Sequence, residues 1–157
     1  MTMHTETVAV AEKFLAKSDD ELEVILGLRE KKIGEQPDLA ADPNLPVMYD
    51  STHLGLLNDA RDIGKRILKR WNKELHGLVC HPKNPEAQKL GEVIANAAGV
   101  KGGVEAALIA AVVSALLVLS LSPAIAAVVA PIVVRKFIVP AGDELCMAWE
   151  EGIAKEG

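Results

Sequence analysis

Residues 106–134 read AALIAAVVSALLVLSLSPAIAAVVAPIVV, a run of 29 residues without a charged side chain. A single straight helix of this length would extend about 43 Å, because an α-helix rises about 1.5 Å per residue. The hydrocarbon core of a bilayer is only about 30 Å thick. The sequence therefore favours a run that is divided into two shorter helices.

The division is predicted at Pro123. Proline has no backbone N–H to donate, and it disfavours helical geometry in the residue before it. Ser120 or Ser122 can cap the helix that follows. We expect an apolar helical hairpin with a first arm over about residues 104–119 and a second arm over about residues 123–139, with a kink at Pro131.

Small side chains recur at four-residue spacing on both arms, a pattern that lets two helix backbones approach closely. They are Ala107, Ala111 and Ala115 on the first arm, and Ala126 and Ala130 on the second. We predict that these alanines form the contact between the arms. The same pattern occurs in membranes and in tightly packed soluble helices, so it leaves the surroundings of the hairpin open.

Apolar residues at helical spacing predict further helices on both sides of the hairpin. Before it we expect helices over residues 6–17, 18–34 and 58–78, and a fourth that begins with Asn84 as N-cap and Pro85 as first residue and ends near residue 99. After it, Leu145, Trp149 and Ile153 predict a last helix. Ser18 and Glu21 have capping-box spacing, and Gly34 is the expected stop of the second helix. Prolines in residues 35–52 predict a connecting loop.

No stretch alternates apolar and polar residues long enough to predict a half-buried strand. A chain of 157 residues is about one domain in length. The sequence therefore predicts an all-α protein with a single domain over residues 1–157, a bundle of about six helices around the Ala/Val/Leu-rich hairpin.

Charge divides the chain into three regions. Residues 1–50 carry 5 Lys/Arg against 11 Asp/Glu, residues 51–101 carry 9 against 5, and residues 102–157 carry 3 against 6. The net charge of −5 gives no general reason to bind nucleic acid. Because the first 20 residues lack the pattern of a secretory signal, we expect a cytoplasmic protein. A location peripheral to the inner face of the membrane, or inserted there, stays open beside this expectation.

The predicted helix over residues 58–78 is basic and amphipathic, and it carries most of the candidate contacts to a membrane or a protein partner. These candidates are Arg61, Lys65, Arg66, Lys69, Arg70, Trp71 and Lys73, together with Arg135 and Lys136 from the second arm. Such a helix can lie on an anionic membrane surface or bind an acidic partner. The alternative is a solvated face that is neutralised by the acidic first 50 residues.

Candidates for chemistry are weak. His76, Cys80, His81 and Cys146 supply nitrogen and sulfur, but a structural zinc site needs four ligands in closed geometry, and no paired motif is present. A cysteine with a histidine elsewhere in the chain does not identify a nucleophile. Two cysteines also argue against a small secreted protein stabilised by several disulfides. We expect no catalytic residue, no metal and no cofactor, and we interpret these side chains as ordinary helix-end residues.

Two functions remain open. In the first, a non-enzymatic protein acts on a membrane through its apolar hairpin, as a pore-forming or membrane-perturbing toxin or defence effector. This layout is similar to that of pore-forming colicin domains, in which amphipathic helices cover a hydrophobic hairpin until insertion; the similarity is one of architecture, and no motif carries it. In the second, a soluble helical adaptor uses the hairpin only as its core. The partners left open are membrane lipid, another protein and a second copy of the chain.

Overall fold

The structure is a computed structural model that describes residues 2–47, 54–98, 105–141 and 144–156; within these ranges it contains helices and no strand. The longer helices are α1 (Thr2–Phe14), α2 (Asp19–Glu35), α3 (Leu54–Cys80), α4 (Pro85–Ala98), α5 (Glu105–Val118), α6 (Pro123–Val133) and α8 (Leu145–Glu156). A 3-10 turn, η1 (Pro37–Ala41), follows α2, and a π-helical turn, η2 (Val134–Ile138), joins α6 to the short α7 (Val139–Ala141). The prediction of an all-α helical bundle is confirmed.

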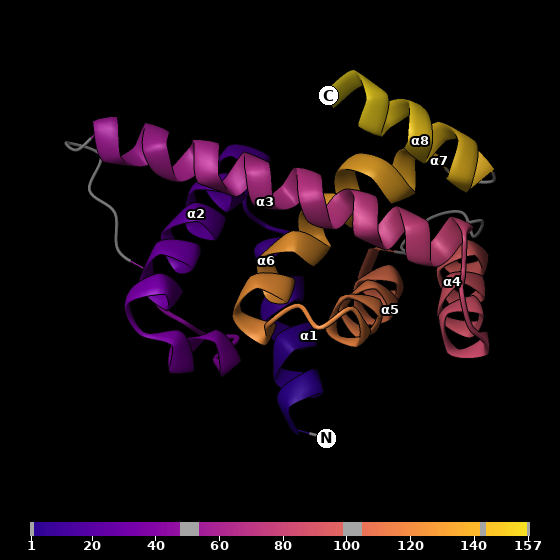
Figure 1. Ribbon diagram of the computed structural model, residues 1–157, viewed down its shortest axis with the longest axis horizontal. Coiled ribbons are helices and arrows are strands. Elements are labelled where there is room, and N and C mark those ends of the chain that lie inside the picture. The colour runs from indigo at the N-terminus through magenta and orange to yellow at the C-terminus, as the bar shows by residue number, and fades with distance from the viewer. Residues whose placement is uncertain (1, 48–53, 99–104, 142–143, 157) are drawn as a thin grey trace.

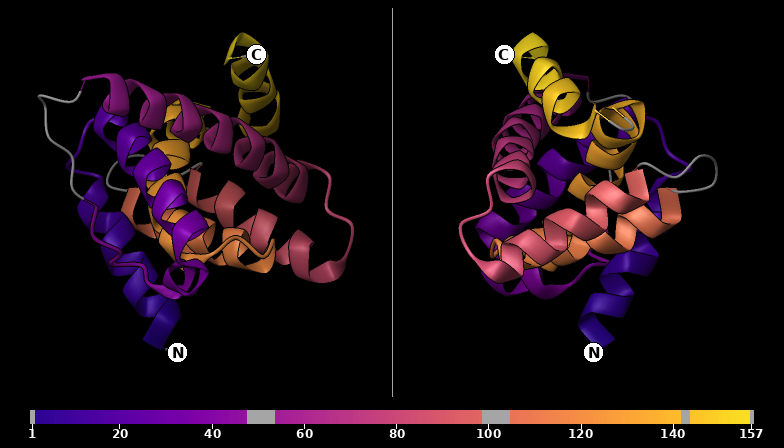
Figure 2. Two further views of the ribbon diagram at one scale, coloured as in Figure 1. Left: turned by 60° about the vertical axis from the view of Figure 1, so that its left-hand side comes forward. Right: turned by 90° about the vertical axis from the view of Figure 1, so that its right-hand side faces the viewer.

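Helix α6 lies in the middle of the bundle, where it packs against α1, α2 and α5 (Figure 1). Helix α3 crosses the molecule and packs against α2 near one end and against α4 and α8 near the other (Figure 1). Helices α4 and α5 lie side by side (Figure 2). The core is therefore built around the apolar run, with the amphipathic helices arranged outside it.

The predicted N-caps of α2 and α4 are confirmed. The Ser18 hydroxyl accepts a hydrogen bond from the backbone N–H of Glu21 at 3.2 Å. The Asn84 side chain accepts one from the backbone N–H of Ala87 at 2.8 Å, and Pro85 is the first residue of α4. These side chains satisfy N–H groups that have no partner inside the helix, so they define where α2 and α4 begin.

The turn between α5 and α6 is confirmed, but its chemistry differs from the prediction. Ser120 has a φ of 72°, its N–H donates to the Leu117 carbonyl, and the Leu121 N–H donates to the Leu116 carbonyl. This pair of bonds is the Schellman ending of a helix, with serine in the left-handed position that glycine usually takes. Ser122 occupies the N-cap position of α6, but its hydroxyl makes no capping bond. Ser120 therefore ends the first arm instead of capping the second.

Predicted boundaries of the first three helices are wrong. The first helix begins at Thr2 instead of residue 6 and ends at Phe14 instead of residue 17, because the chain must leave the helix before Ser18 takes the extended conformation of a cap. Helix α2 continues past Gly34 to Glu35, and Pro37 then prevents further helix. Helix α3 begins at Leu54 and ends at Cys80, beyond the predicted range of 58–78 on both sides. The predicted loop over residues 35–52 also contains the short η1 turn.

The second arm is interrupted by a π-helical turn where a kink was expected at Pro131. Pro131 lies inside α6 and cannot donate a bond to the preceding turn. The Val134 N–H is shared between the carbonyls of Ala130 and Pro131, and η2 begins there. The expected start of the first arm at residue 104, the end of the fourth helix at residue 99, and residues 48–52 of the predicted loop lie outside the described residues.

Candidate functional site

The apolar hairpin is the interior of the bundle. Every residue of α6 from Ala124 to Val133 is buried. Ala126, Ala130 and Ala115 are fully covered, and Ala111 is 8% exposed. Ala107, the first of the predicted alanines, is exposed. Pro123, at the turn, is partly exposed.

By length and composition, one helical segment among the described residues could cross a membrane. It runs over Pro123–Ala141, 19 residues with a mean hydropathy of 1.9, and 72% of it is buried inside the molecule. The core helix of a soluble protein passes the same test. The segment also contains Arg135 and Lys136, which are only partly exposed.

Two arginines hold the ends of α6 to the N-terminal helices. At the start, Arg29 of α2 donates through Nη1 to the Ala124 carbonyl at 2.7 Å. At the end, Arg135 donates through Nη2 to the Asp19 carboxylate at 2.7 Å and through Nη1 to the Leu15 carbonyl at 2.8 Å. The partly buried Arg135–Asp19 ion pair is a charge-assisted contact in restricted solvent, so it is stronger than a typical surface pair. The chain around the junction of α1 and α2 therefore fastens the central helix.

The basic residues of α3 do not form a uniform surface. Lys65, Arg66, Lys69, Arg70 and Lys73 are exposed. Arg61 is partly buried and donates to the Asn58 side chain at 3.3 Å, which turns it toward its own helix. The guanidinium of Arg70 lies 5.0 Å from the centre of the Trp71 ring. Arg135, another predicted contact residue, is already committed to Asp19 and Leu15.

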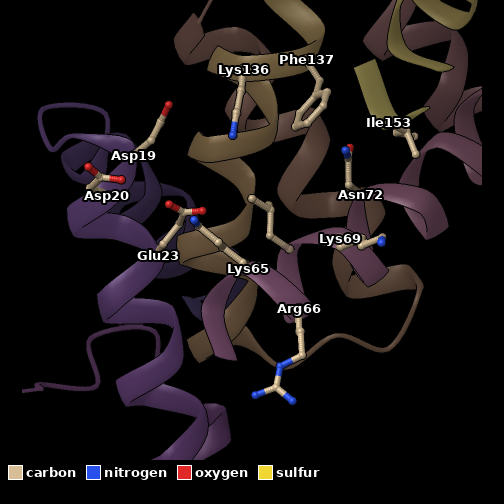
Figure 3. Close-up of a pocket in the computed structure, with 11 residues that line it drawn as sticks. Asp19, Asp20, Glu23, Lys65, Arg66, Lys69, Asn72, Lys136, Phe137 and Ile153 are labelled. Carbon is tan, nitrogen blue, oxygen red and sulfur yellow. The ribbon is translucent and has the colours of Figure 1, made fainter. Parts of the chain in front are cut away.

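Part of this basic surface faces acidic residues of α2 across a cleft of about 570 Å³. The residues that line it are Asp19, Asp20 and Glu23 from α2, Lys65, Arg66, Leu68, Lys69 and Asn72 from α3, Lys136 and Phe137 from η2, and Ile153 from α8. Figure 3 shows Glu23 and Lys65 pointing toward one another, with Lys136 directed into the cleft from the hairpin side. The side chain of Arg66 points away from the acidic group (Figure 3). The structure thus places four of the nine predicted contact residues around one cleft and leaves the other five outside it: Arg61, Arg70, Trp71, Lys73 and Arg135.

Glu23 is a buried acidic residue in the lining of this mixed-charge cleft. The residue is only 5% exposed, and burial raises the pKa of its carboxyl above the ordinary value of 4.5. The positive charges of Lys65 and Lys136 lower this pKa, and the negative charges of Asp20 and Asp19 raise it. Because burial outweighs the two lysines, the folded protein holds a proton on Glu23 more tightly than an unfolded chain does.

Sequence reasoning missed a disulfide. Cys80 at the end of α3 and Cys146 at the start of α8 are bonded, with their Cα atoms 5.7 Å apart. The interpretation of both as ordinary helix-end residues is therefore wrong. The only signal was that each cysteine falls at a helix end, and a separation of 66 residues does not reveal which ends meet. The bond closes a loop that contains α4, α5 and α6, so it restricts the unfolded chain around the hairpin.

The histidines near this bond have structural contacts. His76 is buried, its Nε2 lies 3.3 Å from the Cys146 carbonyl oxygen, and its ring packs edge-on against Trp149. The indole N–H of Trp149 donates to the Asn72 side chain at 2.6 Å, which satisfies its polar atom in the core. No group of three or more His, Cys, Asp or Glu in the part of the chain that the structure describes is placed to hold a metal ion.

Comparison of the chain with protein-family models, curated proteins and solved structures finds no match. The arrangement of its own residues is therefore the basis for a function. Three features of that arrangement bear on it. They are the buried α6, the two arginine contacts at its ends, and the mixed-charge cleft beside it.

Proposed function

We propose that this is a non-enzymatic protein that associates with membranes through the α5–α6 hairpin and perturbs the bilayer. The observation that carries the proposal is the cover of α6, a charge-free helix buried beneath α1 and the acidic α2. A helix that is apolar on all sides belongs either in a protein core or in lipid. In the folded protein, the surrounding helices supply the first of these environments to α6. When these helices move apart at a bilayer, lipid supplies the second.

Competition for the basic residues supplies a way to open the cover. In the cleft, Asp19, Asp20 and Glu23 face the lysines of α3 and Lys136. An anionic membrane surface attracts each exposed lysine or arginine by about 1 kcal/mol. Lipid head groups would therefore compete with α2 for these cations. Once Arg135 exchanges both the Asp19 carboxylate and the Leu15 carbonyl for a phosphate, the far end of α6 is no longer held to the junction of α1 and α2.

The length of α6 favours shallow insertion. Its 11 residues extend about 17 Å, which is close to half of the bilayer hydrocarbon thickness. Arg135 and Lys136 follow directly, and long basic side chains reach the interface from such positions. We propose that the hairpin enters one leaflet with its Pro123 turn leading, while these two cations stay among the head groups.

The second candidate is a soluble helical interaction module in which the hairpin never leaves the core. The burial of 72% of the Pro123–Ala141 segment favours it, because most of the segment is already covered by the rest of the protein. The two candidates differ in one behaviour that is simple to measure. A soluble module does not bind anionic vesicles, whereas the membrane-active protein does.

The disulfide bears on where this protein would act. Disulfides persist in oxidising compartments and are rare in the cytosol. The Cys80–Cys146 bond thus favours such a compartment over the cytoplasm that the N-terminal sequence led us to expect. An effector that reaches its target bilayer from outside the producing cell would retain the bond.

The test is binding and dye release with vesicles of phosphatidylglycerol and phosphatidylcholine, compared with vesicles of phosphatidylcholine alone. We expect release from the anionic vesicles and a decrease as salt is raised, because salt screens the attraction. Replacement of Arg66, Lys69, Arg70 and Lys73 by Gln should weaken binding by on the order of 1 kcal/mol per residue and remove the salt dependence.

A matched control changes the same net charge elsewhere. Lys31, Lys83, Lys89 and Lys155 are exposed lysines outside the basic face of α3. Their replacement by Gln should reduce binding much less. Absence of binding by the parent protein would reject the membrane function in favour of the soluble module, and equal effects of the two quadruple variants would reject a specific role for α3.

A further inference from the structure

A second cavity, of about 320 Å³, lies between α1, α2 and the segment over residues 44–47. The charged side chains that line it are all cationic, although the first 50 residues of the chain carry 11 acidic residues and only 5 basic ones. It is lined by Val10, Lys13, Phe14, Lys17, Ile25, Arg29, Asn44, Leu45, Pro46 and Val47, without an acidic side chain. Three of the five basic residues of this region thus converge on one cavity.

Arg29 is the buried member of this group. The residue is 3% exposed, and its guanidinium lies 5.2 Å from the centre of the Phe14 ring. Nη1 donates to the Ala124 carbonyl, but Nε is buried and has no hydrogen-bond partner among the described residues. No carboxylate in the described ranges lies within ion-pair distance of Arg29. One donor of a buried cation is therefore left without an acceptor.

A buried charge without a counter-charge is costly, so proteins pair such groups. Burial lowers the pKa of Arg29 to about 10, and the negative charge of Asp42 opposes this change only in part. The guanidinium is still protonated at neutral pH. An anion in the adjoining cavity would supply both the missing charge and the missing acceptor.

We propose that this cavity binds a phosphate group, with Arg29 at its base and Lys13 and Lys17 at its rim. Arginine offers donors that match phosphate oxygens, and lysines add charge from the side. Lys13 is exposed, and Lys17 lies 3.8 Å from Glu21 in an exposed pair that costs little to rearrange. The site is independent of the proposed membrane function, because its cavity and its buried cation are present in the folded protein before any contact with a bilayer.

The apolar part of the lining bears on what carries the phosphate. Apolar side chains form much of the cavity wall, which suits a hydrocarbon group attached to the phosphate. They are Val10, Phe14, Ile25, Leu45 and Val47. A lipid head group with the start of its acyl chains and a soluble phosphate share the same charged end. Two probes therefore distinguish the sources: inorganic phosphate, and dihexanoyl phosphatidic acid below its micelle concentration.

The experiment is a titration of the folded protein with each probe, followed by ¹H–¹⁵N NMR at constant ionic strength with chloride as the reference anion. We expect a saturable shift of the Arg29 Nε–H signal and of backbone signals of α1 next to Lys13. Lys13→Gln should weaken binding severalfold without loss of folding, because this side chain is exposed. Lys31→Gln, on the exposed surface of α2 and outside the cavity, is the matched control and should leave the affinity unchanged.

Each outcome decides the proposal. Saturable binding of both probes with similar affinity supports a site for soluble phosphate, and binding of the short-chain lipid at least tenfold tighter supports a lipid head group. The proposal is overturned if neither probe gives a saturable shift beyond the chloride reference, or if Lys13→Gln and Lys31→Gln change the affinity equally. None of these results depends on vesicle binding, so failure of this site and failure of the membrane function can be told apart.

Discussion

Two glycines bring α2 and α3 close enough to form the mixed-charge cleft. A Cβ atom added to Gly27 would overlap the Ala60 carbonyl oxygen, and one added to Gly64 would overlap the Glu23 carbonyl oxygen. Each glycine thus lets its own helix meet the backbone of the other. This close approach places Glu23 beside Lys65, which no spacing in the sequence indicates.

The first prediction follows from this contact. Gly64→Ala should lower the free energy of unfolding by about 1–3 kcal/mol or more, because the added methyl group requires the two helices to separate. Gly77 lies on the same helix with nothing within 4 Å of an added Cβ, so Gly77→Ala should raise it by about 0.5–1 kcal/mol. Urea unfolding measures both. Equal effects of the two substitutions would show that the helices do not touch at Gly64.

Glu23 gives a prediction for pH. Its pKa in the folded protein is raised above 4.5, so its contribution to stability is fully present below that pH and is lost as the pH rises through the folded-state pKa. Glu23→Gln removes this titration. The free energy of unfolding of the variant, relative to that of the parent, should therefore increase between a pH below 4.5 and pH 7, which means that the variant gains relative stability. A relative stability that falls with rising pH would mean that the lysines, and not burial, control the carboxyl.

At the scale of the helix, the sequence predicts best where one side chain satisfies one backbone group. Ser18, Asn84 and Pro85 act within their own turn, so their positions predict the starts of α2 and α4. Gly34 fails as a stop signal because Pro37 ends α2 slightly later. Ser120 in the left-handed conformation could not be predicted, since serine adopts it only where the surrounding packing requires it.

The hairpin itself supplies the third prediction. Ala111 is 8% exposed on α5, so Ala111→Leu adds atoms to a packed core and should cost about 1–3 kcal/mol. Ala107 is exposed one turn earlier on the same helix, and Ala107→Leu should change stability by less than about 0.5 kcal/mol. Thermal or urea unfolding of the pair distinguishes the two positions. If Ala111→Leu is as stable as the parent, the face of α5 that bears Ala111 is not closely packed.

At the scale of the whole molecule, charge composition predicts which regions are acidic and basic, but tertiary structure decides which charges meet. The sequence left open that the acidic first 50 residues neutralise the basic helix. In the cleft between α2 and α3, acidic residues of α2 do face lysines of α3. The pairing of Arg135 with Asp19, separated by 116 residues, has no trace in the sequence. The same holds for the contact of Arg29 with Ala124 and for the disulfide, because each joins segments that only the folded chain brings together.

If the α5–α6 hairpin leaves the core and enters a bilayer, residues 106–134 come into contact with lipid acyl chains. A photoactivated carbene probe dissolved among the acyl chains labels only the residues that reach them. With phosphatidylglycerol vesicles, mass spectrometry should locate the label on peptides that contain α6, whereas protein irradiated with phosphatidylcholine vesicles should carry none there. Label confined to the outer face of α3, or absent from the protein, would contradict insertion and leave α6 as a permanent core helix.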